Sequence, residues 1–223
     1  MLAGKPWEIS VLVARPLITT LAAFVLVAAA SAANPASTDK QLAMKLVVAQ
    51  GDVPSMWRRS PVQHPPISII RCLARPALTT TARASSYFFT PNLVTTGANV
   101  TSAATVFKSK TNASSYYRTI VRTFPACLRR VARLGRPHDA ISVARPLSFP
   151  RYGDQSGAWW LGVTSRFGGR EIRYHWVLVR TGRAVFGDLF LFARGYVEVP
   201  GLTNVQAEQE IVRQELGRAR GSA

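Results

Sequence analysis

Residues 171–193 have the sequence EIRYHWVLVRTGRAVFGDLFLFA. In the first half, aromatic and aliphatic side chains alternate between two faces, with Tyr174, Trp176 and Leu178 on one and His175, Val177 and Val179 on the other. The second half, from Arg183 to Ala193, is almost entirely apolar, and Thr181-Gly182 between the halves is typical of a tight turn. Because strands joined by so short a turn must be antiparallel, this stretch predicts a β-hairpin.

Four further strands are predicted on both sides of that hairpin in the sequence. They are Ala84–Thr90, Asn99–Phe107, Ala140–Phe149 and Ala158–Phe167. Alternation is clearest in Asn99–Phe107, where Val100, Ala104 and Val106 share one face. Gly97-Ala98 and Gly168-Gly169 predict hairpin turns, whereas the prolines in residues 58–66 predict a loop.

Three helices complete the pattern. The strongest is Thr111–Arg136, in which apolar residues recur every three or four positions; Pro125 should kink it. A first helix is expected to begin with Thr38 as N-cap and to stop at Gly51, and a last one covers Asn204–Leu216. The predicted order is α-β-β-α-β-β-β-β-α, an α+β fold in which helices pack on an antiparallel sheet of about six strands.

Composition agrees with one globular domain. The chain has 223 residues, 48% of them apolar and 17% charged, which excludes a chain that is disordered throughout, a collagen-like repeat and a multi-span membrane protein. Lysine and arginine number 28 against 11 acidic residues, so the formal net charge is +17. Such a balance favours anionic partners.

The N-terminus has the parts of a secretory signal peptide. Lys5 and Arg15 precede the apolar run Leu17–Ala30, and Ala30-Ser31-Ala32 has the small residues of a cleavage site. The run is shorter than a bilayer span, although an uncleaved anchor remains the alternative. We therefore expect a signal peptide over residues 1–32, a linker over 33–37, one domain over 38–217 and a disordered tail over 218–223. The expected location is secreted or associated with the cell envelope.

The chain has two cysteines, Cys72 and Cys127. An even count in an exported chain predicts one disulfide, with two buried free thiols as the alternative. There is no CxxC motif, and the cysteines and histidines lack the spacing of zinc ligands. We expect no metal and no cofactor.

No catalytic motif is found. The three histidines, His64, His138 and His175, have no nucleophile motif around them, and Gly-x-Ser-x-Gly is absent. Asp188 is unusual because it lies inside an apolar strand; pairing with Arg180 or Arg173 is expected, and a buried catalytic acid is the alternative. No catalytic residue is assigned, and a hydrolase with an unrecognised site is a third functional hypothesis.

The long helix carries arginines along one face, which at helical spacing fall within about one sixth of a turn. These residues are Arg118, Arg122, Arg129, Arg133 and Arg136. Such a row is either a solvated face or an anion-binding surface for envelope polymers or lipid headgroups. No specific nucleic-acid motif accompanies it.

Four aromatic residues are candidates for a ligand cleft between the sheet and the helices: Trp57, Trp160, Tyr174 and Trp176. Aromatic residues at strand spacing more often belong to the core, which is the alternative. The ligand expected for such a cleft is small and apolar or amphipathic.

Four segments in order resemble one family of actinobacterial exported proteins. They are LVVAQGDVPSMW at 46–57, VTSAATVF at 100–107, Ala126-Cys127-Leu128, and VLVRTGRAV at 177–185. Together they resemble the PknH-like extracellular sensor domains and LpqN-type lipoproteins, which have a PsbP-like α-β-α fold. Val53 and Met56 stand where the family often has leucine and glycine.

The resemblance covers roughly residues 39–216 and implies ligand sensing or association with the envelope. The kinase-borne domains have two disulfides, whereas this chain can form only one, and a sensor role without a kinase domain would require a separate transducer. We therefore expect a non-enzymatic, ligand- or partner-binding envelope protein. The alternative is a cationic surface protein that binds anionic polymers or headgroups.

Overall fold

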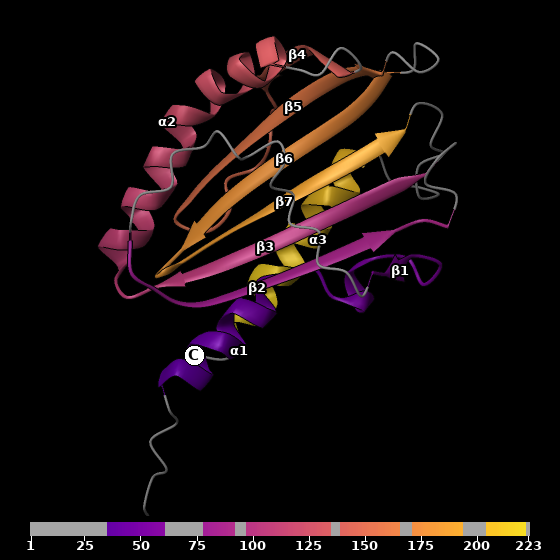
Figure 1. The fold of residues 1–223 in the computed structure, drawn as a ribbon. Coiled ribbons are helices and arrows are strands. Elements are labelled where there is room, and N and C mark those ends of the chain that lie inside the picture. The colour runs from indigo at the N-terminus through magenta and orange to yellow at the C-terminus, as the bar shows by residue number, and fades with distance from the viewer. Residues whose placement is uncertain are drawn as a thin grey trace, which may run out of the picture. The chain divides into compact units, whose positions relative to one another are not determined.

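The hairpin predicted from residues 171–193 lies in the middle of a seven-stranded antiparallel sheet in a computed structural model of the chain (Figure 1). The structure describes residues 35–60, 78–91, 97–134, 139–165, 171–193 and 204–221, all within one compact unit, residues 33–223. The strands are β1 (Arg58–Arg59), β2 (Thr80–Phe89), β3 (Ala98–Phe107), β4 (Asp139–Pro146), β5 (Gln155–Ser165), β6 (Glu171–Thr181) and β7 (Ala184–Ala193). The helices are α1 (Pro35–Lys45), η1 (Gln50–Asp52), α2 (Lys110–Leu134) and α3 (Asn204–Arg220).

The strand order across the sheet is β1-β2-β3-β7-β6-β5-β4. Neighbours in the chain pair as hairpins, except that α2 carries the chain from β3 to the far edge, where β4 begins. The chain then returns strand by strand until β7 pairs with β3. The α+β class and the antiparallel sheet are confirmed, and β1 adds a short strand where a loop was predicted.

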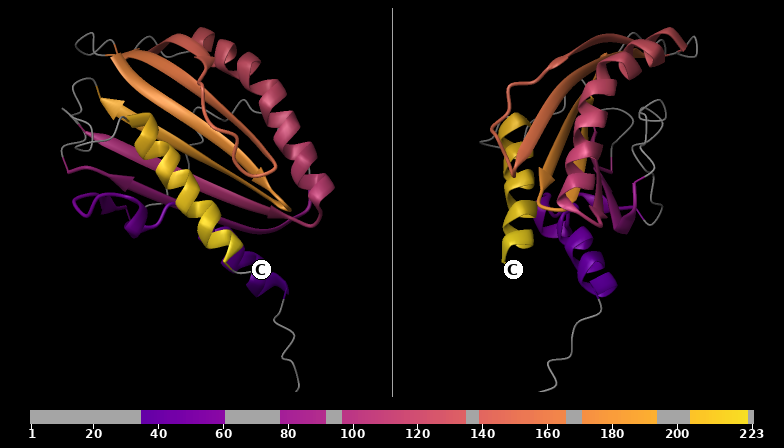
Figure 2. Two further views of the ribbon diagram at one scale, coloured as in Figure 1. Left: turned by 180° about the vertical axis from the view of Figure 1, so that it is seen from behind. Right: turned by 90° about the vertical axis from the view of Figure 1, so that its left-hand side faces the viewer.

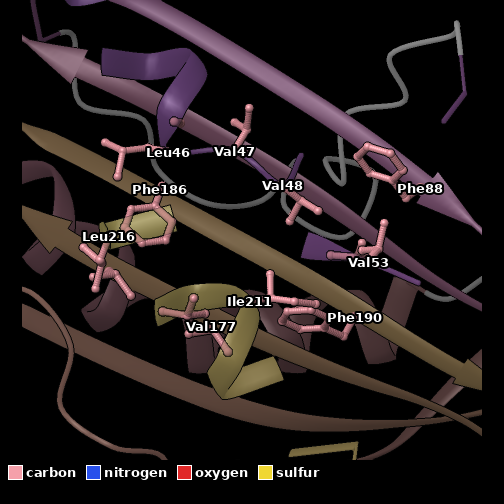
Figure 3. Close-up of a cluster of buried hydrophobic side chains, with 14 of the residues drawn as sticks. Leu46, Val47, Val48, Val53, Phe88, Val177, Phe186, Phe190, Ile211 and Leu216 are labelled. Atoms are coloured by element: carbon pink, nitrogen blue, oxygen red, sulfur yellow. The ribbon is translucent and has the colours of Figure 1, made fainter. Parts of the chain in front are cut away.

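Helices cover both faces of the sheet, with α2 on one face and α1 and α3 on the other (Figure 2). Successive apolar side chains of a strand point to opposite faces of the sheet, so each face has apolar residues for helices to cover. In β7, Phe186 and Phe190 join the core cluster with Ile211, Val212 and Leu216 of α3, while Val185 and Leu189 face α2. Figure 3 shows the first of these clusters, in which Leu46, Val47 and Val48 also lie.

Helix α2 packs through a regular stripe. Ala113, Tyr117, Ile120, Phe124 and Cys127 are buried and follow each other at intervals of three or four residues, as predicted. The helix is continuous through Pro125.

Helix boundaries differ from the predictions at both ends of the domain. Thr38 was predicted as an N-cap but lies inside α1, which begins at Pro35, a residue suited to a first helical turn. Residues 35–37 are therefore helix and not linker. The helix ends at Lys45 because the next three residues leave it to fill the core. Residues 218–220 belong to α3, so the predicted disordered tail is wrong there.

Two glycines with positive φ lie near the β6–β7 turn and differ in their surroundings. Gly182 has φ 55° and open space around it, whereas Gly153 has φ 60° and a Cβ there would lie 2.4 Å from the Arg180 carbonyl oxygen. We expect Gly153→Ala to lower the free energy of unfolding by about 2 kcal/mol. The matched Gly182→Ala, which has strain but no clash, should cost about 1 kcal/mol. Urea unfolding of both variants measures the difference, and equal losses would contradict the clash.

Candidate functional site: a buried polar row under the C-terminal helix

Three polar side chains lie side by side on the sheet face that α3 covers. Ser86 of β2 pairs with Ser102 of β3, and Ser102 pairs with Asp188 of β7. All three are buried, Asp188 at 0% exposure. We call these residues the polar row.

Helix α3 places two glutamates over this face. Glu208 and Glu215 are seven residues apart, which is two helical turns, so both point the same way. They are 1% and 0% exposed and lie among Ile211, Val212 and Leu216. The helix therefore buries carboxyl groups on its apolar face, where ionised side chains are costly unless they are paired.

Glu215 meets the polar row directly. The Ser102 hydroxyl donates a hydrogen bond to Glu215 Oε1 at 3.3 Å. The other oxygen, Glu215 Oε2, both carboxyl oxygens of Asp188 and the Ser86 Oγ make no hydrogen bond of ordinary geometry within the described residues. Asp188 and Glu215, which we call the carboxyl pair, are thus buried with few partners.

Burial changes the ionisation of this pair. It raises the pKa of Asp188 to about 6, with Ser102 and Glu215 close enough to oppose the rise. The pKa of Glu215 lies well above its ordinary value, first because of burial and then because the Asp188 carboxylate repels its charge. Two carboxyl groups in one buried site are more stable when they hold a proton between them.

A second buried contact joins His175 of β6 to α3. His175 Nδ1 lies 2.7 Å from Glu208 Oε1, which is a hydrogen-bond distance. Burial raises the pKa of Glu208, while the hydrogen bond and the charge of His175 lower it. With His175 only 7% exposed, this dyad is part of the core.

The C-terminal part of α3 is attached to the segment after α1. The Arg218 guanidinium donates to the carbonyl oxygens of Lys45 and Val47 and forms an ion pair with Asp52 of η1. One residue after Glu208, the Tyr152 hydroxyl donates to the carbonyl oxygen of Gln209 at 3.3 Å. These contacts place α3 over the polar row.

A row of paired residues on the same face extends across all seven strands. From edge to edge it contains Arg59, Phe88, Val100, Phe190, His175, Trp160 and Arg145. At the β4 edge, the exposed Arg145 guanidinium lies 4.9 Å from the centre of the Trp160 ring. Trp160 is half-buried, so this end of the row is open to solvent.

The four aromatic residues predicted to line one cleft are divided between the two faces of the sheet. Trp57 is buried in the cluster under α1 and α3, and Trp160 lies on that same face. Trp176 and Tyr174 belong to the opposite cluster, under α2. The structure therefore does not bring the four together. Trp176 instead stacks on Trp159, with ring centroids 5.1 Å apart, and packs at a tilt against Phe124, with ring centroids 4.1 Å apart.

Part of the predicted arginine face can be placed. Arg118 and Arg122 are exposed on α2, one turn apart and away from the sheet. Arg129 and Arg133 fall within α2, but their side chains lie outside the described residues, as does Arg136. The anion-binding assignment stays a prediction.

The disulfide also stays a prediction. Cys127 is 4% exposed on the buried face of α2, and Cys72 lies outside the described residues. The proposed signal peptide, residues 1–32, lies outside them too. No helix among the described residues has the length and apolar character to span a membrane.

Arg180 and Arg173 were predicted as partners of Asp188; Arg180 is wrong, and the side chain of Arg173 lies outside the described residues. Arg180 pairs with Asp154 at 3.0 Å and donates to Gln155, because it points to the α2 side while Asp188 points to α3. Sequence reasoning missed Glu208 and Glu215, although both share the spacing of Ile211 and Leu216 on one helical face. That spacing was the available signal.

In the described part of the chain, no three His, Cys, Asp or Glu side chains form a group suited to a metal ion. The polar row and the His175–Glu208 dyad are closed off by α3. This arrangement can hold and release protons inside the core.

No protein-family profile and no curated protein matches the sequence. Among solved structures, the chain is similar to the extracellular domain of PknH from Mycobacterium tuberculosis, with a TM-score of 0.50 and 11% identity over 82% of this chain and 96% of that chain. It also matches a putative uncharacterized protein (Rv0999 ortholog) from Mycobacterium smegmatis, with a TM-score of 0.40 and 10% identity over 82% and 98% of the two chains. At such identities the similarity concerns the fold alone.

Proposed function

We propose that this protein is an extracytoplasmic, non-enzymatic, sensor-like domain that binds a small amphipathic ligand or an envelope component. The observation that carries the proposal is the open end of the seven-residue row, where Arg145 lies over Trp160. The fold similarity to the extracellular domain of PknH supports the choice of class. So does the burial of the ionisable groups, since His175 and Asp188 lie where an external substrate does not reach them.

The Trp160–Arg145 platform suits a ligand with an apolar body and an anionic head. A half-buried indole ring offers apolar contact area, and the adjacent guanidinium offers donors for a carboxylate or phosphate. Trp57 and Trp176 are buried in core clusters, so Trp160 is the better candidate among the predicted cleft residues.

Titration with oleate, and with neutral monoolein as comparison, tests this site. We expect saturable oleate binding that survives moderate salt, and we expect Arg145→Gln or Trp160→Ala to weaken it about tenfold, equivalent to about 1.4 kcal/mol. Arg151→Gln removes the same charge from a nearby exposed loop residue and should leave binding unchanged. Equal binding by wild type and Trp160→Ala would refute the site, and native mass spectrometry of protein from its own host would identify any retained ligand.

A second function is favoured by the exposed arginines on α2, which fit an anionic polymer or a headgroup surface. We expect the double variant Arg118→Gln/Arg122→Gln to bind anionic lipid vesicles about thirtyfold more weakly at low salt, since each surface arginine contributes about 1 kcal/mol. Cosedimentation with vesicles measures this. The control Arg58→Gln/Arg59→Gln removes two exposed charges at β1. If both double variants lose affinity equally, net charge alone accounts for binding.

A further inference from the structure

The helix α3 buries acidic side chains that its packing does not require. Apolar residues alone would seal the interface, yet Glu208 and Glu215 lie between Ile211, Val212 and Leu216 against the sheet. A buried carboxyl group is tolerated when it is protonated or paired. The stability of this interface therefore depends on where protons are bound.

Titratable or charged groups from three neighbouring elements and from α3 itself face the two glutamates. Around Glu215 these are Asp188 of β7, Asp52 of η1 and Arg218 of α3 itself. The Arg218 guanidinium is already paired with Asp52. Full ionisation of the carboxyl pair would therefore leave its repulsion uncompensated, and one bound proton removes that repulsion.

Around Glu208 the titratable neighbour is His175 of β6, whose imidazole is hydrogen-bonded to it. The negative charge of Glu208 can be compensated, because an imidazole can carry a positive charge. Neither member of the carboxyl pair can do this for the other. The pH-dependent part of the interface is thus the Asp188–Glu215 end of α3.

We propose that the docking of α3 on the sheet is coupled to proton binding by the Asp188–Glu215 pair, so that α3 is a pH-responsive element of the domain. Mild acid favours the docked helix, and higher pH weakens it. The inference stands independently of the ligand proposed above.

Topology makes α3 the part that moves. Asp188 is held on β7, which is bonded to β3 on one side and β6 on the other. Helix α3 contributes no strand to the sheet and is the last described element of the chain. When both carboxyl groups of the pair are ionised and repel each other, the helix can separate from the sheet without breaking hydrogen bonds between strands.

Hydrogen exchange on the full chain tests the coupling. Amide protection of residues 204–220 would be measured at about pH 5 and about pH 8, corrected for intrinsic exchange, with α2 amides as the internal reference. We expect the protection of α3 to fall at least about tenfold relative to α2 as pH rises, since a tenfold change corresponds to one unit of pKa. Parallel changes in α3 and α2 would overturn the proposal, because they would show global unfolding only.

Two variants mimic the protonated pair. Glu215→Gln and Asp188→Asn keep the side-chain shape without the charge, and each should abolish the pH dependence of α3 protection. Glu210→Gln makes the same chemical change on the solvent side of the same helix, where Glu210 pairs with Arg213, and should keep the wild-type dependence. If Glu215→Gln and Asp188→Asn respond to pH as the wild type does, the pair is not the sensor of pH.

Discussion

Replacement of Phe124 by alanine is expected to lower the free energy of unfolding by about 4 kcal/mol, the range for a large aromatic residue removed from a core. The Phe124 ring contacts Trp159 and Trp176, with centroids 4.9 and 4.1 Å away, and joins the middle of α2 to the sheet. Its loss leaves a cavity that two stacked indole rings cannot close by small movements. Chemical denaturation gives the free energy.

Two matched variants on α2 separate packing from helix propensity. Phe124→Leu retains much of the volume and should cost about 1.5 kcal/mol. Arg122→Ala changes an exposed residue two positions earlier and should stay within about 0.5 kcal/mol of wild type. A Phe124→Ala loss as small as that of Arg122→Ala would mean that α2 does not depend on this aromatic cluster.

The second large effect is a loss of stability as pH rises. Asp188 has a pKa of 3.8 in the unfolded chain and about 6 in the folded protein, so the folded state binds its proton more tightly. Its contribution is therefore full below about pH 4 and disappears as pH rises through about 6. At about 1.4 kcal/mol for each tenfold change in proton affinity, the loss is about 3 kcal/mol. Glu215, whose pKa is also raised, acts in the same direction.

Urea unfolding of wild type and Asp188→Asn between about pH 4 and pH 8 measures this loss. The difference between the two proteins isolates the pair from the general effect of net charge. We expect Asp188→Asn to be the more stable protein at the alkaline end and to have a flatter profile. The pKa of Asp39, which Arg183 lowers, concerns more acidic conditions and leaves this interval unchanged. A wild type that gains stability from Asp188 ionisation over the same interval would contradict the assignment.

The strands and the long helix could be predicted because each signal was local. The turn at Thr181-Gly182 and the alternation in 171–193 depend on neighbouring residues, and β6 and β7 formed as predicted. The carboxyl pair could not be found the same way, since Asp188 and Glu215 meet only after α3 has crossed the sheet. The division of Trp57 and Trp176 between two faces likewise depends on tertiary packing.

The pairing of β3 with β7 has a consequence for the order of events during synthesis. The hairpin of β2 and β3 is complete early in the chain, and β4, β5 and β6 can pair with one another as they emerge. Yet one edge of β3 has no partner strand until β7 (Ala184–Ala193) is made, because this central strand is the last of the described strands along the chain. A chain leaving a ribosome or a narrow pore N-terminus first thus remains in two unjoined halves, and we expect closure of this long-range contact to be the slow step of folding.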